Sequence, residues 1–229
     1  MLISYNHKFI FFHIAKVAGI SIRNALKEYS QEPEAFKVKR PPKKLPNNKP
    51  NPFYEMWKSF LLHAKAKEAK TELPEEVYNN FYKFAFVRNP WDWQVSMYHF
   101  ILKETSHVKH KLVKSMTSFD EYLEWVISTE NPYPKGATKL QKDIITDCDG
   151  KLIVDFVGRY ETLVPDFNQV CRTLNIETSL PSLNRTIHRD YKSYYSSEKT
   201  KKMVGQHFKE DIELFGYTFD GYGSQVNVK

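Results

Sequence analysis

The sequence has few of the residues on which metal sites, disulfide frameworks and membrane spans depend. It contains 2 cysteines, Cys148 and Cys171, whose spacing matches no metal site, and we expect both to be free thiols. No apolar run approaches the roughly 20 residues that a helix needs to cross a bilayer. The segment 1–12 lacks the charged start and the long apolar run of a signal peptide. We therefore expect a cytoplasmic protein without a membrane span or a metal site.

The sequence also lacks a Walker A loop, because the pattern GxxxxGK[ST] does not occur. It shows no clear acidic residue of the Walker B kind that would hold magnesium. These two absences argue against a P-loop nucleotide phosphotransferase, which stays open as an alternative.

The composition is that of one globular domain. Hydrophobic residues make up 41% of the 229 residues and aromatic residues 15%, which indicates an aromatic-rich core. The formal net charge of +7 and the pI near 9.1 favour an anionic ligand. Nucleic acid also fits this charge, but the sequence has no zinc-finger spacing, RNP motif or basic heptads. We expect a single domain over residues 1–229, and the oligomeric state stays open.

The segment from Lys8 to Ala25 has the pattern of a strand, a turn and a helix. The apolar run Phe9–Phe12 predicts a short buried strand. A turn with Lys16 and Gly19 follows, and apolar residues then recur at helical spacing over residues 21–26. Backbone N–H groups at a helix N-terminus, together with the helix dipole and an ammonium, form an anion site. An ordinary strand–helix connection with an exposed lysine explains the same pattern.

A second segment, Tyr82 to Phe100, repeats this arrangement. Residues 84–87 predict another buried strand, Arg88 stands at its carboxyl end, and Pro90 suits the first turn of a helix. Ser96 follows inside that helix. Arg88 and Ser96 can both reach a phosphate at the carboxyl end of the strand, where ligands bind in open α/β sheets.

These two segments, in this order, resemble the sulfotransferase superfamily, and within it the carbohydrate-type sulfotransferase family 2. The stretch HIAKVAGISI resembles the loop of that family that binds the 5′-phosphosulfate, and FAFVRNPWDWQVSMY resembles its 3′-phosphate segment. The chain looks like a soluble, bacterial member. The expected fold is α/β, a P-loop-like three-layer fold whose mostly parallel sheet is flanked by helices. The likeness continues over residues 153–167, 180–184 and 211–219, and it is least clear over 32–53.

The resemblance implies a reaction and a set of site residues. The donor would be 3′-phosphoadenosine 5′-phosphosulfate, the product 3′,5′-adenosine bisphosphate, and the acceptor a hydroxyl group on a carbohydrate that can be anionic. No metal is required, because the leaving group is a stable phosphate. The implied donor-binding residues are Lys16, Ala18, Gly19, Ile20 and Ser21 at the 5′-phosphosulfate, and Arg88 and Ser96 at the 3′-phosphate, with Lys16 also acting in catalysis.

His63 is the implied catalytic base. A single histidine is more often a surface or packing residue, but the family places its base upstream of the 3′-phosphate segment. A hydroxyl that attacks sulfur must lose its proton, and imidazole titrates near neutral pH. His13, by contrast, is implied to be the structural histidine of the loop.

A later polar segment, residues 183–195, is implied to close over the nucleotide. Its candidate contacts are Arg185, Arg189 and Lys192, and a surface loop explains the segment equally well. Arg159 is either a further anion contact or an ion-pair partner of Glu161.

The loop departs from the family pattern at several positions. Ala15, Val17 and Ile20 stand where the family usually has Pro, Thr and Thr, and Trp93 replaces a usual Arg. Two hydroxyl groups able to contact sulfate or phosphate are therefore missing. This observation supports the alternative of a non-catalytic protein that binds a nucleotide or an anionic glycan.

Residues 31–52 are rich in Lys and Pro and predict a flexible insertion within the domain. It is either a solvated linker or a lid that helps to hold an anionic acceptor.

Other elements are predicted from periodicity and capping residues: a helical pattern over 54–80 broken at Pro74, a loop over 103–114, a helix over 119–127 with Ser118 and Glu121 as a capping box, a strand over 152–160, a helix over 164–174, and a helix over 197–215 that stops at Gly216.

Overall fold

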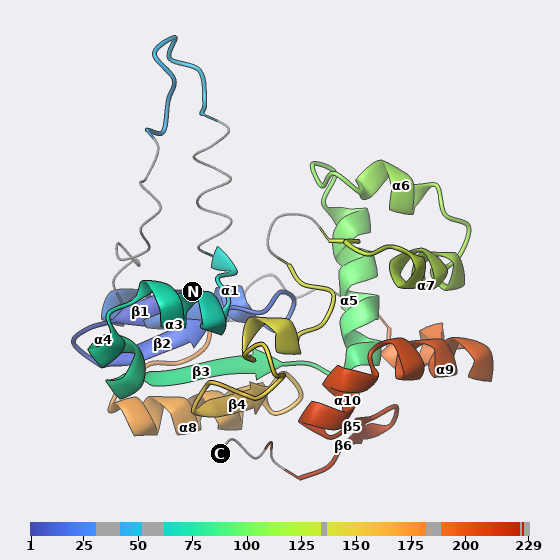
Figure 1. The fold of residues 1–229 in the computed structure, drawn as a ribbon. Coiled ribbons are helices and arrows are strands. Elements are labelled where there is room, and N and C mark those ends of the chain that lie inside the picture. The colour runs from blue at the N-terminus through green and yellow to red at the C-terminus, as the bar shows by residue number, and fades with distance from the viewer. Residues whose placement is uncertain (31–41, 52–61, 134–136, 182–188, 225, 227–229) are drawn as a thin grey trace.

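The centre of the protein is a four-stranded sheet in the order β1–β2–β3–β4 (Figure 1). This computed structural model describes all residues except 31–41, 52–61, 134–136, 182–188, 225 and 227–229. Strands β2 and β3 pair in parallel, as do β3 and β4, whereas β1 is antiparallel at the edge. The predicted mostly parallel sheet is thus confirmed. The strands are β1 (Leu2–Ser4), β2 (Phe9–Phe12), β3 (Tyr82–Val87) and β4 (Phe156–Arg159).

Strand β2 is apolar along its whole length and β3 is apolar from Phe84 to Val87, as expected where both faces of a sheet are covered. Every residue of β2 is buried, and such continuous apolar runs are typical of parallel strands. Phe84 of β3 packs between Phe9 and Phe11 of β2, with ring centroids 5.9 and 5.3 Å apart. This aromatic packing fixes the register that brings the carboxyl ends of β2 and β3 together.

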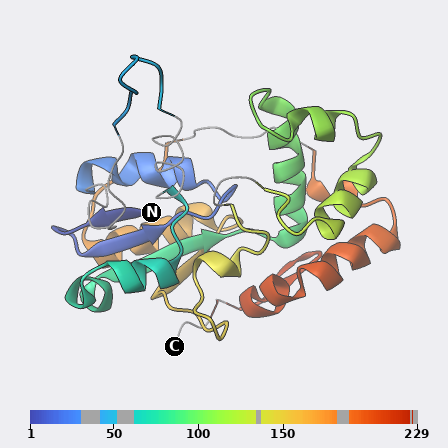
Figure 2. The same cartoon turned by 45° about the horizontal axis from the view of Figure 1, so that its top comes forward.

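Helices surround the sheet and also form a second group beyond the carboxyl end of β3 (Figures 1 and 2). Helix α8 packs against β4. The helices near the sheet are α1 (Gly19–Leu26), η1 (Lys27–Tyr29), α3 (Ala66–Glu72), α4 (Glu75–Asn80), η2 (Lys142–Ile144) and α8 (Leu163–Leu174). The second group contains α5 (Pro90–Lys103), α6 (His110–Lys114), α7 (Phe119–Ser128), η3 (Tyr191–Tyr194), α9 (Glu198–His207), α10 (Lys209–Phe215) and the hairpin β5 (Tyr217–Thr218) and β6 (Gly221–Tyr222).

The helix boundaries follow local signals. Pro90 is the first residue of α5, and the Asn89 side chain caps that helix by accepting from the Trp91 N–H at 3.1 Å. The Ser118 hydroxyl caps α7, as predicted. The carboxylate of Glu121 accepts from the Thr117 N–H rather than from that of the cap, so the capping box is displaced by one residue.

Three predicted elements differ in the structure. The helix over 197–215 is interrupted at Phe208, which is fully buried between α9 and α10. The strand over 152–160 is shortened to β4, because Leu152 forms a bridge with Thr146 instead. The loop over 103–114 contains the short helix α6. Of the helical pattern predicted over 54–80, residues 66–72 and 75–80 form α3 and α4, with Pro74 as the cap of α4, and residues 54–61 lie outside the described residues. The three-layer arrangement and the single domain remain predictions.

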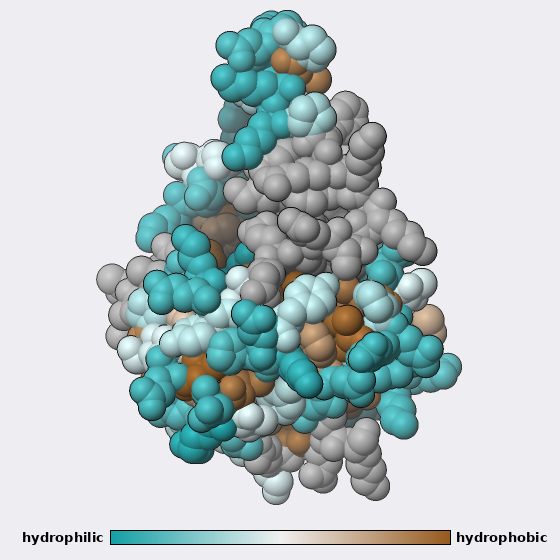
Figure 3. Space-filling model, turned by 90° about the vertical axis from the view of Figure 1, so that its left-hand side faces the viewer, coloured by the Kyte–Doolittle hydropathy of each residue, from teal (hydrophilic) through white to brown (hydrophobic). Residues whose placement is uncertain are grey.

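The surface seen from the left-hand side of Figure 1 is mostly hydrophilic, with separate apolar patches (Figure 3). Among the described helices, none is both long and apolar enough to cross a bilayer.

Cys148 is exposed, Cys171 is buried, and both are free thiols. Of the Lys- and Pro-rich insertion, residues 42–51 are described, and Lys44 and Pro50 form a bridge in it; the rest lies outside the described residues.

Gly158 of β4 offers a test of the sheet packing, because it stands opposite Phe86 of β3. A Cβ atom at Gly158 would lie 2.4 Å from a ring carbon of Phe86, which is fully buried. We predict that Gly158→Ala lowers the free energy of unfolding by about 1–3 kcal/mol, measured by urea denaturation. Gly221→Ala is the control, since a Cβ there meets nothing within 4 Å, and its effect should stay within about 0.5 kcal/mol.

Candidate active site

The loop between β2 and α1 has an unusual backbone conformation. Lys16 and Ala18 have φ angles of 63° and 62°, in the left-handed region that costs free energy for residues other than glycine. The loop leads directly into α1, whose N-terminus has neither a side-chain cap nor an acidic residue in its first turn. Its backbone N–H groups therefore present the positive end of the helix dipole.

Side chains from other elements hold three carbonyl groups of this loop. The His13 carbonyl accepts from His63 Nδ1 at 3.0 Å, and the Ala15 carbonyl accepts from Trp93 Nε1 at 2.7 Å. The Lys16 carbonyl accepts from an Arg88 guanidinium N–H at 3.3 Å. Because these carbonyl groups are bonded to side chains outside the loop, the loop can offer N–H groups to an anion.

Gly19 and His13 are a matched pair in the loop. A Cβ atom at Gly19 would lie 2.0 Å from His13 Cδ2, so the imidazole occupies the space that any other residue would need. His13 is 4% exposed and stacks on Phe11 with ring centroids 6.0 Å apart. Burial and the neighbouring His63 lower the pKa of His13 well below its usual value. A packed, neutral imidazole supports the structural role predicted for this residue.

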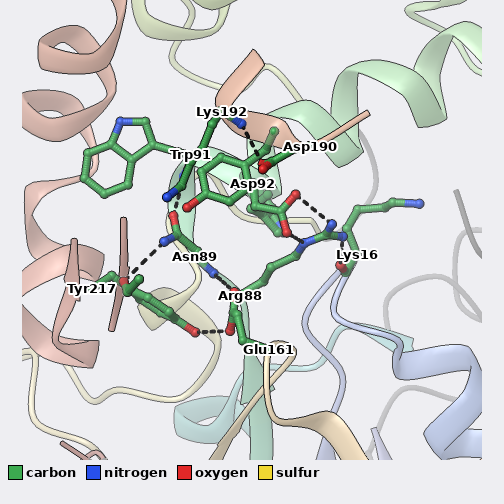
Figure 4. Close-up of polar contacts among 12 residues, drawn as sticks. Lys16, Arg88, Asn89, Trp91, Asp92, Glu161, Asp190, Lys192 and Tyr217 are labelled. Carbon is green, nitrogen blue, oxygen red and sulfur yellow. Dashed lines mark hydrogen bonds and ion pairs between the residues drawn. The ribbon is translucent and has the colours of Figure 1, made fainter. Parts of the chain in front are cut away.

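The Lys16 ammonium lies 4.3 Å from the centre of the Phe100 ring. Figure 4 shows that it points away from the pair formed by Arg88 and Asp92. Burial, Arg88 and Lys103 together lower the pKa of Lys16 to about 8, and among the described residues no carboxylate pairs with it. A desolvated ammonium among other cations favours binding of an anion.

Arg88 is a buried cation at the carboxyl end of β3, and it is 4% exposed. Its Nε and one terminal nitrogen donate to the two oxygens of Asp92 at 2.8 and 2.9 Å (Figure 4). The guanidinium also stacks on Tyr160, 4.0 Å from the ring centre. Ser96 of α5 is fully buried, and its Oγ atom has no hydrogen-bond partner among the described residues.

Two residues that the sequence analysis left without a role fix the backbone of Arg88. The Gln141 side chain accepts from the Arg88 N–H at 2.9 Å and donates to the Arg88 carbonyl at 2.8 Å. The carboxylate of Asp211 in α10 accepts from the backbone N–H groups of Gln141 and Lys142 at 2.8 and 2.9 Å. Burial raises the pKa of Asp211 to about 7, although these two donors act in the opposite direction.

The hairpin of β5 and β6 is hydrogen-bonded to the start of α5, directly and through Glu161 (Figure 4). The Glu161 carboxylate accepts from the Asn89 N–H at 2.7 Å and from the Tyr217 hydroxyl at 3.0 Å. The Asn89 side chain donates to the Thr218 carbonyl at 2.8 Å. Arg159 donates to the carbonyl groups of two C-terminal residues, Phe215 and Ser224, so its observed contacts are structural.

His63 lies against the loop, with its ring 5.0 Å from that of His13. A carbonyl can only accept a hydrogen bond, so Nδ1 of His63 carries the proton and Nε2 carries the lone pair. Burial lowers the pKa of His63 to about 4, with smaller contributions from the N-terminal amine and Arg23. The ring is therefore neutral near pH 7, in the tautomer that lets Nε2 accept a proton.

The remaining predicted contacts are only partly described. Arg185 lies outside the described residues. Arg189 is exposed and lies 5.4 Å from the centre of the Tyr194 ring. Lys192 pairs with Asp220 at 2.8 Å. The roles of Arg185 and Arg189 at a nucleotide stay predictions.

A cavity of about 720 Å³ is lined by residues that neighbour His63 in the sequence and Trp93 in space. Lys65, two residues after His63, lines one part of it, and Tyr133, whose ring packs edge-to-face on Trp93 at 5.4 Å, lines another. Further lining residues include Lys109, Lys139, Glu130 and Asp143. No sequence motif marks this cavity, because its walls come from separate segments of the chain.

Comparison with known proteins identifies one family. A sequence model of the sulfotransferase family matches residues 1–218, a range that contains the loop, Arg88 and Ser96 and that ends in β5. Comparisons with curated proteins and with solved structures give no match.

Asp211 gives the site a measurable pH dependence. Its pKa of about 7 in the folded chain exceeds the usual value of 3.8, so the folded chain binds this proton more tightly. The resulting stabilisation is complete below the unfolded pKa and is lost as the pH rises through the folded one. We predict that the free energy of unfolding of the wild type, relative to Asp211→Asn, falls between about pH 4 and pH 7, by at most about 1.4 kcal/mol per pH unit.

Urea denaturation of both proteins at a series of pH values measures this difference. Asp143→Asn is the control for loss of charge alone. It removes a partly exposed carboxylate from η2, next to Lys142, whose N–H donates to Asp211. A constant difference between the wild type and Asp211→Asn across the window would contradict the prediction.

Proposed function

Because the chain belongs to the sulfotransferase family, we propose that it transfers the sulfuryl group of 3′-phosphoadenosine 5′-phosphosulfate to a hydroxyl group of a carbohydrate. One observation carries this proposal. The uncapped N-terminus of α1, the loop residue Lys16 and the Arg88 guanidinium all lie where β2 and β3 end, and an Arg88 N–H donates to the Lys16 carbonyl. Three sources of positive charge at the carboxyl edge of a parallel sheet suit a nucleotide with two phosphate groups.

The 5′-phosphosulfate would bind to the loop. Lys16 would neutralise the charge that develops on the leaving phosphate, and the left-handed conformation of Lys16 and Ala18 turns the chain so that α1 begins at Gly19. Fixed donors aimed at developing charge lower the barrier of such a transfer without covalent help from the protein. The donors in the loop would be the backbone N–H groups of Ala18, Gly19, Ile20 and Ser21.

The 3′-phosphate would bind to Arg88 and Ser96. Asp92 holds one edge of the guanidinium, and the remaining terminal nitrogen is directed at the loop, where it meets the Lys16 carbonyl. A phosphate beside this edge would give the buried Ser96 hydroxyl a partner. The arginine is oriented before the ligand arrives, because Asp92 and Gln141 already fix it.

His63 would act as the base. The acceptor oxygen forms a bond to sulfur, the bond between sulfur and the phosphate oxygen breaks, and the acceptor proton passes to His63 Nε2. A pKa of about 4 keeps the imidazole neutral and ready for this proton. An anionic donor bound nearby would raise that pKa toward the working pH, which would make the proton transfer more favourable.

The acceptor would enter through the cavity lined by Lys65 and Tyr133. Three lysines, Lys65, Lys109 and Lys139, outnumber the two carboxylates of Glu130 and Asp143 in its wall, which suits an acceptor that carries negative groups of its own. Lys139 also donates to the Ile127 and Thr129 carbonyl groups at the end of α7, so its position is fixed.

One observation favours a second candidate, a protein that binds the nucleotide without turnover. The Val17 side chain is fully buried, and Ile20 is 48% exposed at the start of α1. An apolar group thus stands beside the proposed phosphate site.

Calorimetric titration with 3′,5′-adenosine bisphosphate, with ATP as the control, tests the proposal. Micromolar binding of the bisphosphate and much weaker binding of ATP would support it. Binding of the bisphosphate without any transfer to carbohydrate acceptors would select the second candidate. Binding of ATP alone, with magnesium, would replace both with a phosphotransferase, and no binding of either nucleotide would overturn the nucleotide site.

We predict that Arg88→Lys weakens binding of the bisphosphate about 10- to 100-fold. Lysine keeps the charge but loses the planar pair of hydrogen bonds, and a hydrogen bond to a charged group contributes about 1.5–3 kcal/mol. Isothermal titration calorimetry measures the change. Arg159→Lys is the matched control, because Arg159 is equally buried and pairs in register with Val87 on the neighbouring strand. Arg159→Lys should lower the free energy of unfolding and leave the affinity for the bisphosphate unchanged.

We predict that His63→Asn lowers kcat/KM for sulfuryl transfer by about 10²–10⁴-fold and leaves the affinity for the bisphosphate within about twofold of wild type. Asparagine can still donate to the His13 carbonyl but cannot accept the proton. The matched control is His110→Asn, because His110 Nδ1 also lies 3.0 Å from a backbone carbonyl, that of Ile101. Normal turnover by His63→Asn would remove His63 from the mechanism.

A further inference from the structure

The loop conformation needs support from outside the loop. Lys16 and Ala18 both occupy the left-handed region, which is unfavourable for residues with a Cβ atom. Ala15 has no ring to restrict its φ angle, as a proline would have. Nothing in the local sequence therefore selects this conformation, and contacts from other elements must do so.

Trp93 makes the shortest of the three described hydrogen bonds that hold the loop carbonyl groups. Its indole N–H donates to the Ala15 carbonyl at 2.7 Å, compared with 3.0 Å for His63 and 3.3 Å for Arg88. The other two anchors have further tasks, since Arg88 also pairs with Asp92 and His63 is the proposed base. The contacts described for the Trp93 side chain are its hydrogen bond to the Ala15 carbonyl and its packing, which includes the Tyr133 ring.

The Trp93 side chain is itself held rigidly. It is 1% exposed and stands on α5, the longest described helix. The Tyr133 ring packs on it edge-to-face at an interplanar angle of 90°, and the Tyr133 hydroxyl donates to Gln94 Oε1 at 2.9 Å. An indole fixed in this way can impose a position on the loop instead of adjusting to it.

We propose that Trp93 is a positioning residue that holds the loop in its donor-binding conformation through the Ala15 carbonyl. Drawing this carbonyl toward α5 leaves the N–H groups of the loop and of α1 for the ligand. Because Tyr133 lines the cavity and packs on Trp93, the same indole connects the donor loop to the wall of the acceptor cavity. The inference rests on the proposed function, in which this loop binds the donor.

The chain offers a closely matched pair of variants, Trp93→Phe and Trp91→Phe. Trp91 stands two residues away on α5, is 6% exposed, and its indole N–H donates to the Lys201 carbonyl of α9 at 3.0 Å. Each variant therefore loses one buried indole–carbonyl hydrogen bond and keeps an aromatic ring. Melting temperatures should fall by a similar amount, about 2–4 °C, in both.

The affinity for 3′,5′-adenosine bisphosphate separates the two roles. By isothermal titration calorimetry, we expect Trp93→Phe to bind about tenfold more weakly than wild type, whereas Trp91→Phe stays within twofold. A second readout uses the wild-type protein alone: in a ¹H–¹⁵N spectrum, the indole N–H signal of Trp93 should shift when the bisphosphate is added, while that of Trp91 should not. This second readout decides the question even if Trp93→Phe does not fold.

The outcomes distinguish this inference from the proposed function. If the wild type binds the bisphosphate and Trp93→Phe binds it equally well, the inference is overturned and the nucleotide site stands. Equal weakening by both variants, or an unmoved Trp93 signal at saturation, also overturns the inference. If the wild type binds no bisphosphate, the proposed function fails and the role of Trp93 fails with it.

Discussion

A guanidinium group that is buried at the end of a central strand must have its charge and its N–H groups matched by the protein, and this requirement organises the structure around Arg88. Asp92 supplies the opposite charge, Tyr160 covers one face, and Gln141 holds the backbone. The remaining edge meets the Lys16 carbonyl. Four separate segments of the chain therefore meet at one cation, and each is positioned relative to the others by it.

The loop before α1 shows how the geometry proposed for an anion site can be built without a glycine-rich sequence. Its carbonyl groups are engaged by His63, Trp93 and Arg88, so the negative ends of these peptide dipoles do not oppose a ligand. The single glycine of this loop, Gly19, is needed because it leaves room for His13. In a glycine-rich loop the backbone itself has the freedom to turn, whereas here three side chains from two other segments of the chain hold it in the required shape.

The sequence was sufficient to predict the features that depend on neighbouring residues. The strands β2 and β3, the start of α5 at Pro90 and the αL stop at Gly216 were predicted correctly, because apolar runs, prolines and glycines act over a few residues. The contacts that complete the site could not be predicted in this way. Gln141 lies 53 residues from Arg88, Asp211 lies 70 residues from Gln141, and Trp93 lies 78 residues from Ala15. The break at Phe208 was missed because the helical periodicity continues across it.

The link between Asn89, Glu161 and the hairpin β5–β6 has a consequence for how the protein is made. A ribosome delivers the loop and Arg88 long before residues 217–222 leave the exit tunnel, so α5 at first lacks the hairpin that bonds to its cap. The contacts that tie the start of α5 to β5 can therefore form only after the hairpin has been synthesised, well after the strand and helix that they join.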